Sequence, residues 1–356
     1  MSRLIKKIDW GLVFTTMALI GIGLASLASS SPELLGKQIL WVAIGCVIAF
    51  LLIHVDLRSF FGNRNVIFGI YFFILALLLL TYFFAPEIKG NRAWLAIGSF
   101  QFQPSELAKV ALIFVLAYFF SRGHVSIGRW KTIFRSFVYF ALPAGLIAIQ
   151  PDIGSAAILF LVWFGFVLVS GIPIRRLAVA GVFFAIAFVV LWVGVLQEYQ
   201  KERILGVFEP ERDPLGVNYS AIQSKIAIGA GGWFGKGFGQ GTQVQLGFLP
   251  EAHNDFIFAA IAEEGGLIIA LVVLGMFLWM ILRILKIGLF IEGNFYKLIC
   301  LGSVIMFFGQ FLLHVGSNIG LLPVIGVTLP FVSYGGSSMV VNMLLIGIIE
   351  SVYVKK

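Results

Sequence analysis

The sequence carries very little charge for its length. Only 12% of its 356 residues are Asp, Glu, Lys or Arg, roughly half the share that is usual in soluble proteins. Hydrophobic residues make up 60%, and the mean hydropathy is +1.01. This composition excludes the two soluble domains that the length alone would suggest. It predicts one integral membrane domain over 1–356.

Cysteines and short catalytic motifs are also scarce. Cys46 and Cys300 both lie inside apolar runs, where they act as small hydrophobic residues. There is no HExxH, no G-x-S-x-G and no cysteine cluster. The net charge of +8 comes from basic residues placed singly or in small groups between apolar runs. That pattern indicates membrane topology, so we expect no nucleic-acid partner.

Uncharged or nearly uncharged runs of membrane-spanning length recur along the chain. The first, 10–30, follows basic residues as in a signal peptide but is too long for a typical signal core, so we interpret it as a retained helix. We expect an all-α polytopic protein with ten transmembrane helices, over 10–30, 37–54, 65–85, 104–120, 134–150, 153–171, 175–196, 254–284, 295–316 and 335–352. An even number places both termini on one side.

Lysine and arginine are concentrated in every second loop and at the termini, and all of these segments lie on one side of the predicted topology. The termini and the loops after the second, fourth, sixth and eighth helices hold 16 of the 25 basic residues, so we expect that side to be cytoplasmic. One long extracytoplasmic loop covers about 197–253. The compositionally unusual segments all fall on the outer face, at 89–109, at 150–156, at the end of the long loop and at 316–338. We therefore expect a functional site on that face.

Polar residues crowd the start of the eighth expected helix. The stretch EAHND, 251–255, offers three polar groups where one helix cap would suffice. Asp255 can be a cap, or a carboxylate at a partly dehydrated helix mouth that accepts a proton. His253 can titrate, bind a ligand or simply lie at the interface, and the last is favoured. Glu263 and Glu264 follow about two turns deeper, on the order of 12 Å, where structural pairing is favoured over chemistry.

Other outer-face segments add candidates. Asp152 follows Gln-Pro and opens the sixth helix, either as its cap or as a second carboxylate facing Asp255. Glu106 and Lys109 lie three residues apart on one helix face, as a local ion pair or with the lysine on an anionic headgroup. The other basic candidates for that role are Arg92, Arg203, Lys225 and Lys236.

The glycine-rich run IGAGGWFGKGFGQGTQ, 228–243, fails the pattern of a phosphate-binding loop. Ala230 stands where the first glycine is required, and Gly237 stands where Ser or Thr is required. A flexible cradle near the membrane, containing Lys236, remains open.

Four long motifs together resemble the SEDS family (shape, elongation, division and sporulation), most closely its rod-shape branch. They are NRAWLAIGSFQFQPSELAK, QPDIGSAAI, the run from QSKIAIGAGG to EAHNDFIFAAIAEEGG, and NIGLLPVIGVTLPFVSYGGSS. The resemblance covers essentially the whole chain. The family often has Thr at the position of Asn254, a small departure that leaves the neighbouring aspartate in place.

The resemblance implies a ten-helix protein of the bacterial inner membrane that polymerises peptidoglycan glycan strands from lipid II during cell elongation. It places the family's essential acid at Asp255, its Gln-Pro-Asp motif at Asp152 and its acid–lysine pair at Glu106 and Lys109. Ser333, in the fourth motif, is a further substrate-binding or supporting candidate. The implied partners are lipid II, the lipid-linked glycan strand, a class B penicillin-binding protein and, more loosely, MreC and MreD. No cofactor is firmly implied, although a divalent cation, Mg or Mn, could act near Asp152.

Two other functions stay open. A lipid II flippase would need polar groups on both faces and through the middle of its path. A non-catalytic scaffold for the transpeptidase would leave the cluster around Asp255 unexplained. The crowding of unusual segments on one face favours an enzyme in which Asp255 acts as general base.

Overall fold

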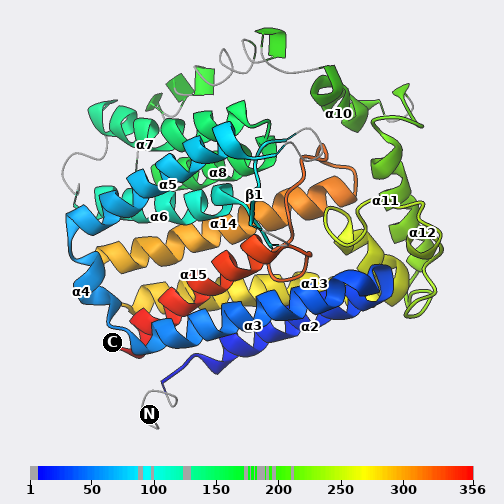
Figure 1. Cartoon of the computed structure of the whole chain (residues 1–356), viewed down its shortest axis with the longest axis horizontal. Coiled ribbons are helices and arrows are strands. Elements are labelled where there is room, and N and C mark those ends of the chain that lie inside the picture. The colour runs from blue at the N-terminus through cyan, green and yellow to red at the C-terminus, as the bar shows by residue number, and fades with distance from the viewer. Residues whose placement is uncertain are drawn as a thin grey trace.

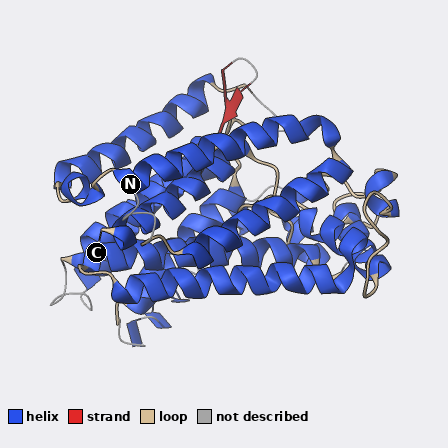
Figure 2. Ribbon diagram, turned by 90° about the horizontal axis from the view of Figure 1, so that it is seen from below, coloured by secondary structure: helices blue, strands red, loops and turns tan. Residues whose placement is uncertain are grey.

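Helices form nearly the whole of the computed structural model (Figures 1 and 2). It describes residues 7–86, 91–97, 100–122, 130–171, 198–209 and 212–355, with scattered residues between 175 and 194. Eight of the described helices are long and apolar enough to cross a membrane, and α8 (Ile153–Val169) is a shorter apolar helix. The chain is therefore a polytopic, all-helical membrane protein.

The described helices match nine of the ten expected spans, with shifted ends. The eight long ones are α2 (Trp10–Ser30), α3 (Pro32–His54), α5 (Arg64–Phe84), α6 (Pro104–Ser121), α7 (Trp130–Ile149), α13 (Ile257–Phe290), α14 (Asn294–Asn318) and α15 (Gly336–Val354). Helix α3 begins earlier than predicted because Pro32 suits the first turn of a helix. The expected helix over 175–196 lies largely outside the described residues.

The centre of the bundle is built from α6, α14 and α15. Helices α6 and α15 are buried on almost all sides, as expected of helices that are apolar all round. Helix α15 packs closely on α3, where a Cβ at Gly347 would lie only 2.7 Å from the Cα of Ala49. Helices α2, α5 and α7 instead expose large apolar side chains such as Phe14, Phe73 and Phe134. Such a surface suits contact with lipid.

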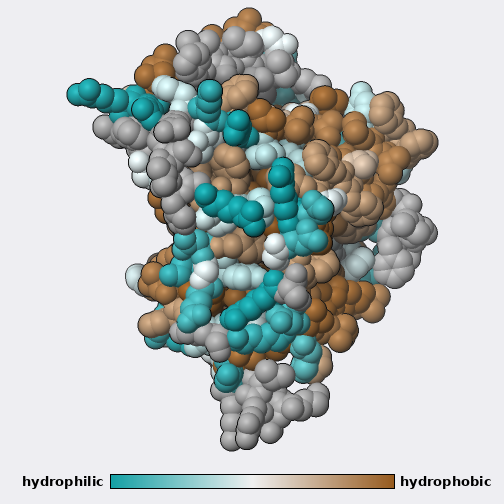
Figure 3. All heavy atoms as spheres, turned by 90° about the vertical axis from the view of Figure 1, so that its left-hand side faces the viewer, coloured by the Kyte–Doolittle hydropathy of each residue, from teal (hydrophilic) through white to brown (hydrophobic). Residues whose placement is uncertain are grey.

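One end of the bundle joins the two ends of the described chain. The backbone N–H of Asp9 donates to Glu350 (3.1 Å), and the Arg283 guanidinium donates to the Asp9 carboxylate (3.0 Å from Nε). The short helix α4 (Leu57–Phe61) lies at the same end (Figure 1). Figure 3 shows hydrophilic residues gathered across this end, with hydrophobic residues along its side.

The opposite end carries shorter elements. A hairpin of β1 (Leu95–Ile97) and β2 (Phe100–Phe102) precedes α6. The expected long loop is largely helical, with α10 (Glu198–Phe208), α11 (Tyr219–Gly231) and α12 (Thr242–Gln245). These helices are too short for a membrane-length hydropathy window, which explains why composition did not predict them.

Helix α13 is broken after its second turn. Gly266 has a φ of +74°, which favours glycine, and the helix continues beyond it. The break leaves backbone groups that the preceding glycine-rich segment satisfies. The N–H of Lys236 donates to the Glu263 carbonyl (2.9 Å), and the N–H of Leu267 donates to the Gly232 carbonyl (2.9 Å). The glycine-rich segment is thus hydrogen-bonded to α13.

Candidate active site

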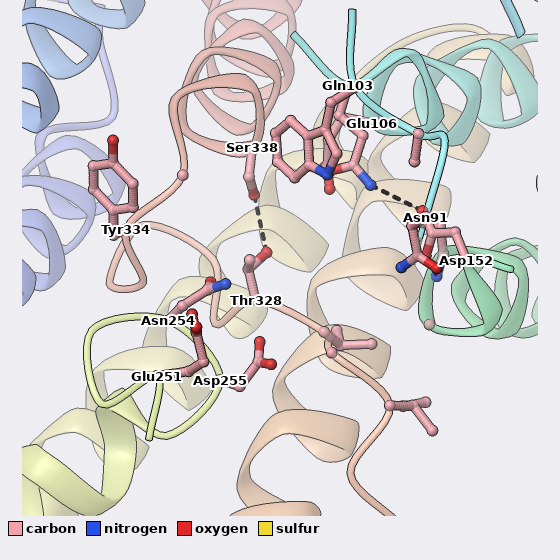
Figure 4. Close-up of a pocket in the computed structure, with 18 of the residues that line it drawn as sticks. Asn91, Gln103, Glu106, Asp152, Glu251, Asn254, Asp255, Thr328, Tyr334 and Ser338 are labelled. Atoms are coloured by element: carbon pink, nitrogen blue, oxygen red, sulfur yellow. Dashed lines mark hydrogen bonds between the residues drawn. The ribbon is translucent and has the colours of Figure 1, made fainter. Parts of the chain in front are cut away.

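Figure 4 shows part of the wall of an open cavity of about 1170 Å³. The cavity lies at the start of α3 and α15, whereas Glu350 and the Asp9 bonded to it lie near the end of α15. Its wall includes the first turns of α3, α6, α8 and α15 and the turn that leads into α13. The first turn of α10 (Glu198–Phe208) lines it as well, so six helices start at or just beyond this cavity. The N-terminus of a helix carries partial positive charge and free N–H groups, so this arrangement favours an anionic ligand.

One wall of the cavity carries the EAHND stretch. Asp255 lies there partly exposed, and its Oδ2 is 3.9 Å from the point where a Cβ on Gly326 would lie. His253 lies beside it, with Nδ1 3.3 Å from the Ser31 hydroxyl and Nε2 3.7 Å from a Glu251 carboxylate oxygen. The interfacial position expected of His253 stays a prediction.

The facing wall carries Asp152 and the acid–lysine pair. Asp152 caps α8, since its Oδ1 accepts from the Ser155 N–H (3.0 Å). Its Oδ2 accepts from Gln103 Nε2 (2.9 Å; Figure 4), so both oxygens are engaged. Glu106 and Lys109 form the predicted local ion pair (2.8 Å) and are almost fully buried. The structure thus brings Asp255, His253, Asp152 and this pair to one cavity.

A family model described as cell cycle protein, covering FtsW, RodA and SpoVE, matches residues 3–356. The chain belongs to this family. The resemblance seen in the four motifs is therefore confirmed, and it extends over nearly the whole chain. The cavity described above lies among the segments that contribute those motifs.

Named relatives of this family align along almost their full length. Peptidoglycan glycosyltransferase MrdB of Escherichia coli K12 is 36% identical over 98% of this chain and 96% of its own. A probable peptidoglycan glycosyltransferase FtsW of Thiomicrospira cyclica is 34% identical over 97% of this chain and 91% of its own.

Solved structures of the family agree with the fold. A chain from a structure described as "Structural coordination of polymerization and crosslinking by a peptidoglycan synthase complex" has a TM-score of 0.84 and 32% identity, covering 97% of each chain. Rod shape determining protein RodA of Thermus thermophilus has a TM-score of 0.72 and 29% identity, covering 97% of this chain and 96% of its own.

The deeper acids of the family's EAHND–EEGG motif lie away from the cavity. Glu263 is fully buried and accepts from the backbone N–H groups of Gln243 (2.9 Å) and Val244 (3.2 Å). Its Oε1 is also 3.3 Å from Lys236 Nζ. Glu264 accepts from the Ser29 hydroxyl. These acids hold the glycine-rich segment and the end of α2, instead of lining space beneath Asp255.

Several predicted basic and polar candidates do not line the cavity either. Lys236 is engaged with Glu263, and the Lys225 side chain lies against Gly320 beside a much smaller pocket. Arg92 is exposed next to the cavity residue Asn91. Ser333 is buried behind the wall.

Further residues of the cavity wall are Arg203, which the sequence had named as a basic candidate, and Lys37 and Tyr334, which it had not. Lys37, in the second turn of α3, is exposed and lines the wall, as does Arg203 of α10. Lys37 belongs to a short outer loop in which basic residues are rare, and that rarity was a usable signal. Tyr334 lines the cavity near the His253 ring, and burial raises the pKa of its hydroxyl. It is therefore a neutral hydrogen-bonding group at physiological pH.

Proposed function

We propose that this chain is a peptidoglycan glycosyltransferase that polymerises lipid II at the outer face of the bacterial inner membrane during cell elongation. The observation that carries the proposal is the partly exposed Asp255 in the wall of a wide, open cavity where six helices begin. Relatives over nearly the full chain bear the name peptidoglycan glycosyltransferase.

Asp255 acts as the general base. It accepts the proton of the GlcNAc 4-hydroxyl of the acceptor lipid II as that oxygen attacks the anomeric carbon of the lipid-linked strand. The new carbon–oxygen bond forms as the bond to undecaprenyl pyrophosphate breaks, and the leaving group keeps the electron pair. One base and a leaving group that is already activated suit a single displacement with inversion, by analogy with inverting glycosidases.

The pyrophosphate needs positive charge around it. Lys37 and Arg203 present cationic side chains on the cavity wall. Lys109 is already neutralised by Glu106 at 2.8 Å and almost fully buried. We therefore assign the main leaving-group contacts to Lys37 and Arg203, with Lys109 and Glu106 shaping the wall.

A divalent cation is not needed for any step of this scheme. Among the residues that the structure describes, no group of three or more His, Cys, Asp or Glu side chains could hold a metal ion. Both oxygens of Asp152 already accept hydrogen bonds. A divalent cation near Asp152 therefore stays a possibility drawn from the family resemblance, and no step is routed through it.

The membrane orientation follows from charge. Arg58, Arg283 and Lys355 lie at the end that joins Asp9 to Glu350, away from the cavity. Basic residues favour the cytoplasmic side, so the cavity opens on the outer face and both termini lie inside. Lipid II then reaches the cavity from the outer leaflet.

A class B penicillin-binding protein is the proposed partner. The similar chain with a TM-score of 0.84 belongs to a peptidoglycan synthase complex that combines polymerization and crosslinking. A polymerase of this kind needs a transpeptidase to cross-link its product. A wider assembly with MreC and MreD stays a prediction from the family resemblance.

Purified protein incubated with lipid II tests the proposal. We expect the wild type to make glycan strands that can be sized on a gel, and Asp255→Ala to make none. Asp56→Asn is the matched control, because Asp56 caps the short helix α4 at the opposite end and asparagine caps equally well. Absence of polymer with the wild type, with lipid II transport across vesicles instead, would favour the flippase.

A further inference from the structure

The backbone of the turn that carries Asp255 is held by hydrogen bonds from residues distant in the sequence. The N–H of Tyr334 donates to the His253 carbonyl (3.0 Å), and the Ser333 hydroxyl donates to the Asn254 carbonyl (2.9 Å). The third carbonyl in the row belongs to Asp255, and it is also held. Three successive carbonyls thus accept hydrogen bonds from the segment that ends α14 or leads into α15.

The third donor is Asn318, the last residue of α14. Its Nδ2 donates to the Asp255 carbonyl (2.9 Å) and to the His314 carbonyl in its own helix (2.8 Å). Its Oδ1 accepts from the N–H of Ala259 (3.1 Å). Asn318 is fully buried. A side-chain amide has two N–H groups and one carbonyl, and all are used here.

The bond to Ala259 supplies a cap that α13 lacks at its own start. The first N–H groups of any helix have no partner within that helix. Helix α13 begins at Ile257, so its cap position is Phe256, whose side chain offers no acceptor. Asn318 accepts one of these N–H groups from a different helix. One amide therefore fixes both the backbone of residue 255 and the first turn after it.

We propose that Asn318 is the positioning residue for the Asp255 base. It holds the backbone on both sides of the carboxylate, so that the carboxylate meets the acceptor hydroxyl at the cavity wall. The inference rests on the proposed function, because the base has a task only if the chain transfers glycosyl groups. A displacement of about 1 Å at a reacting group can cost on the order of a hundredfold in rate.

Three substitutions separate hydrogen bonding from shape. Asn318→Asp keeps the size and the acceptor but removes both N–H donors. Asn318→Ser is smaller but keeps one donor and one acceptor, and Asn318→Ala keeps neither. We expect the polymerisation rate at saturating lipid II to fall about tenfold to hundredfold in Asn318→Asp and Asn318→Ala. The fall should be smaller in Asn318→Ser. The affinity for lipid II should stay within about twofold of wild type, because the cavity wall that binds it is retained.

A purely spatial role predicts another order. In that case Asn318→Asp, which matches asparagine in size, would polymerise at the wild-type rate. Asn318→Ser would then be as slow as Asn318→Ala. Ser303→Ala is the matched control, because Ser303 is also buried in α14 but its hydroxyl donates within its own helix to Ile299 (2.9 Å). Its rate should equal that of the wild type.

Amide hydrogen exchange tests the anchor without the reaction. The N–H groups at 255–261 should exchange about tenfold faster in Asn318→Asp, while those of the second half of α13 stay unchanged. Wild-type exchange there, or wild-type polymerisation by folded Asn318→Asp, overturns the inference. If the wild type makes no polymer but exchange accelerates as expected, the anchor stands and the proposed function fails.

Discussion

Asp255 and Glu263 are two acids only eight residues apart, and the structure uses them in opposite ways. Glu263 is fully buried, and its oxygens accept from two backbone N–H groups and lie beside Lys236. Asp255 is held through its backbone carbonyl by Asn318, and its side chain lies on the wall of an open cavity. A carboxylate that supports a fold is surrounded by donors. The carboxylate proposed to perform chemistry is held through its backbone and lines the cavity.

The largest expected effect is the loss of polymerisation activity when Asp255 is replaced. Replacing Asp255 by Asn removes the base and should lower the polymerisation rate by about 10²- to 10⁴-fold. The unfolding temperature should stay close to that of the wild type, because the backbone bond from Asn318 remains. Strand synthesis and thermal unfolding in detergent measure both effects. An active Asp255→Asn enzyme would refute the assignment of the base.

The next effect concerns the break in α13 at Gly266, three residues after Glu263. A Cβ at Gly266 would lie 2.3 Å from the Gly235 nitrogen, and the φ of +74° is unfavourable for alanine. Gly266→Ala should lower the free energy of unfolding by about 3 kcal/mol. Gly275→Ala in the same helix is the control, because a Cβ there meets none of the described atoms within 4 Å. It should be neutral or slightly stabilising. Equal stability of the two variants would show that the break is not required.

Glu263 itself should matter for stability before it matters for catalysis. Glu263→Gln turns one acceptor into a donor that faces the backbone N–H groups of the glycine-rich segment, at a cost of about 2 kcal/mol. At a temperature where the variant is folded, polymerisation should stay within about threefold of wild type, since Glu263 does not line the cavity. A loss as large as that of Asp255→Asn, without unfolding, would remove the distinction between the two acids.

The smallest expected effect tests whether Lys37 on the cavity wall contacts the pyrophosphate. Lys37→Gln should raise the lipid II concentration needed for half-maximal rate by about two- to fivefold, because exposed charges contribute little each. The difference from wild type should shrink as salt is added. Lys286→Gln, an exposed lysine at the opposite end, is the control. A salt-independent effect would argue against a charge contact at position 37.

Long apolar runs predicted the helices well because hydrocarbon leaves few alternatives for a spanning segment. Motif resemblance predicted the family and brought Asp255, Asp152, Glu106 and Lys109 together, and the structure places all four on one cavity. These successes depend on local composition or on long shared motifs, both of which a single sequence displays directly.

The elements that were missed depend on contacts between distant parts of the chain. Two adjacent glycines in an apolar run are compatible with a continuous helix, so the break at Gly266 shows only when residues 232–237 pair with it. Asn318 reads as an ordinary polar residue at a helix end. Its role requires the knowledge that α14 ends beside the start of α13.

The burial of α15 has a consequence for the order of biosynthesis. Helix α15 is the last described helix to be made, yet it packs on α3 near the start of the chain and carries Ser338 into the cavity wall. Asp9 likewise gains its partners Glu350 and Arg283 only after those later residues have been synthesised. Early helices that enter the membrane therefore have an incomplete site until translation is nearly finished. A prematurely ended chain that lacks α15 would lack the part of the cavity wall that Gly336 and Ser338 supply, and we expect it to be inactive.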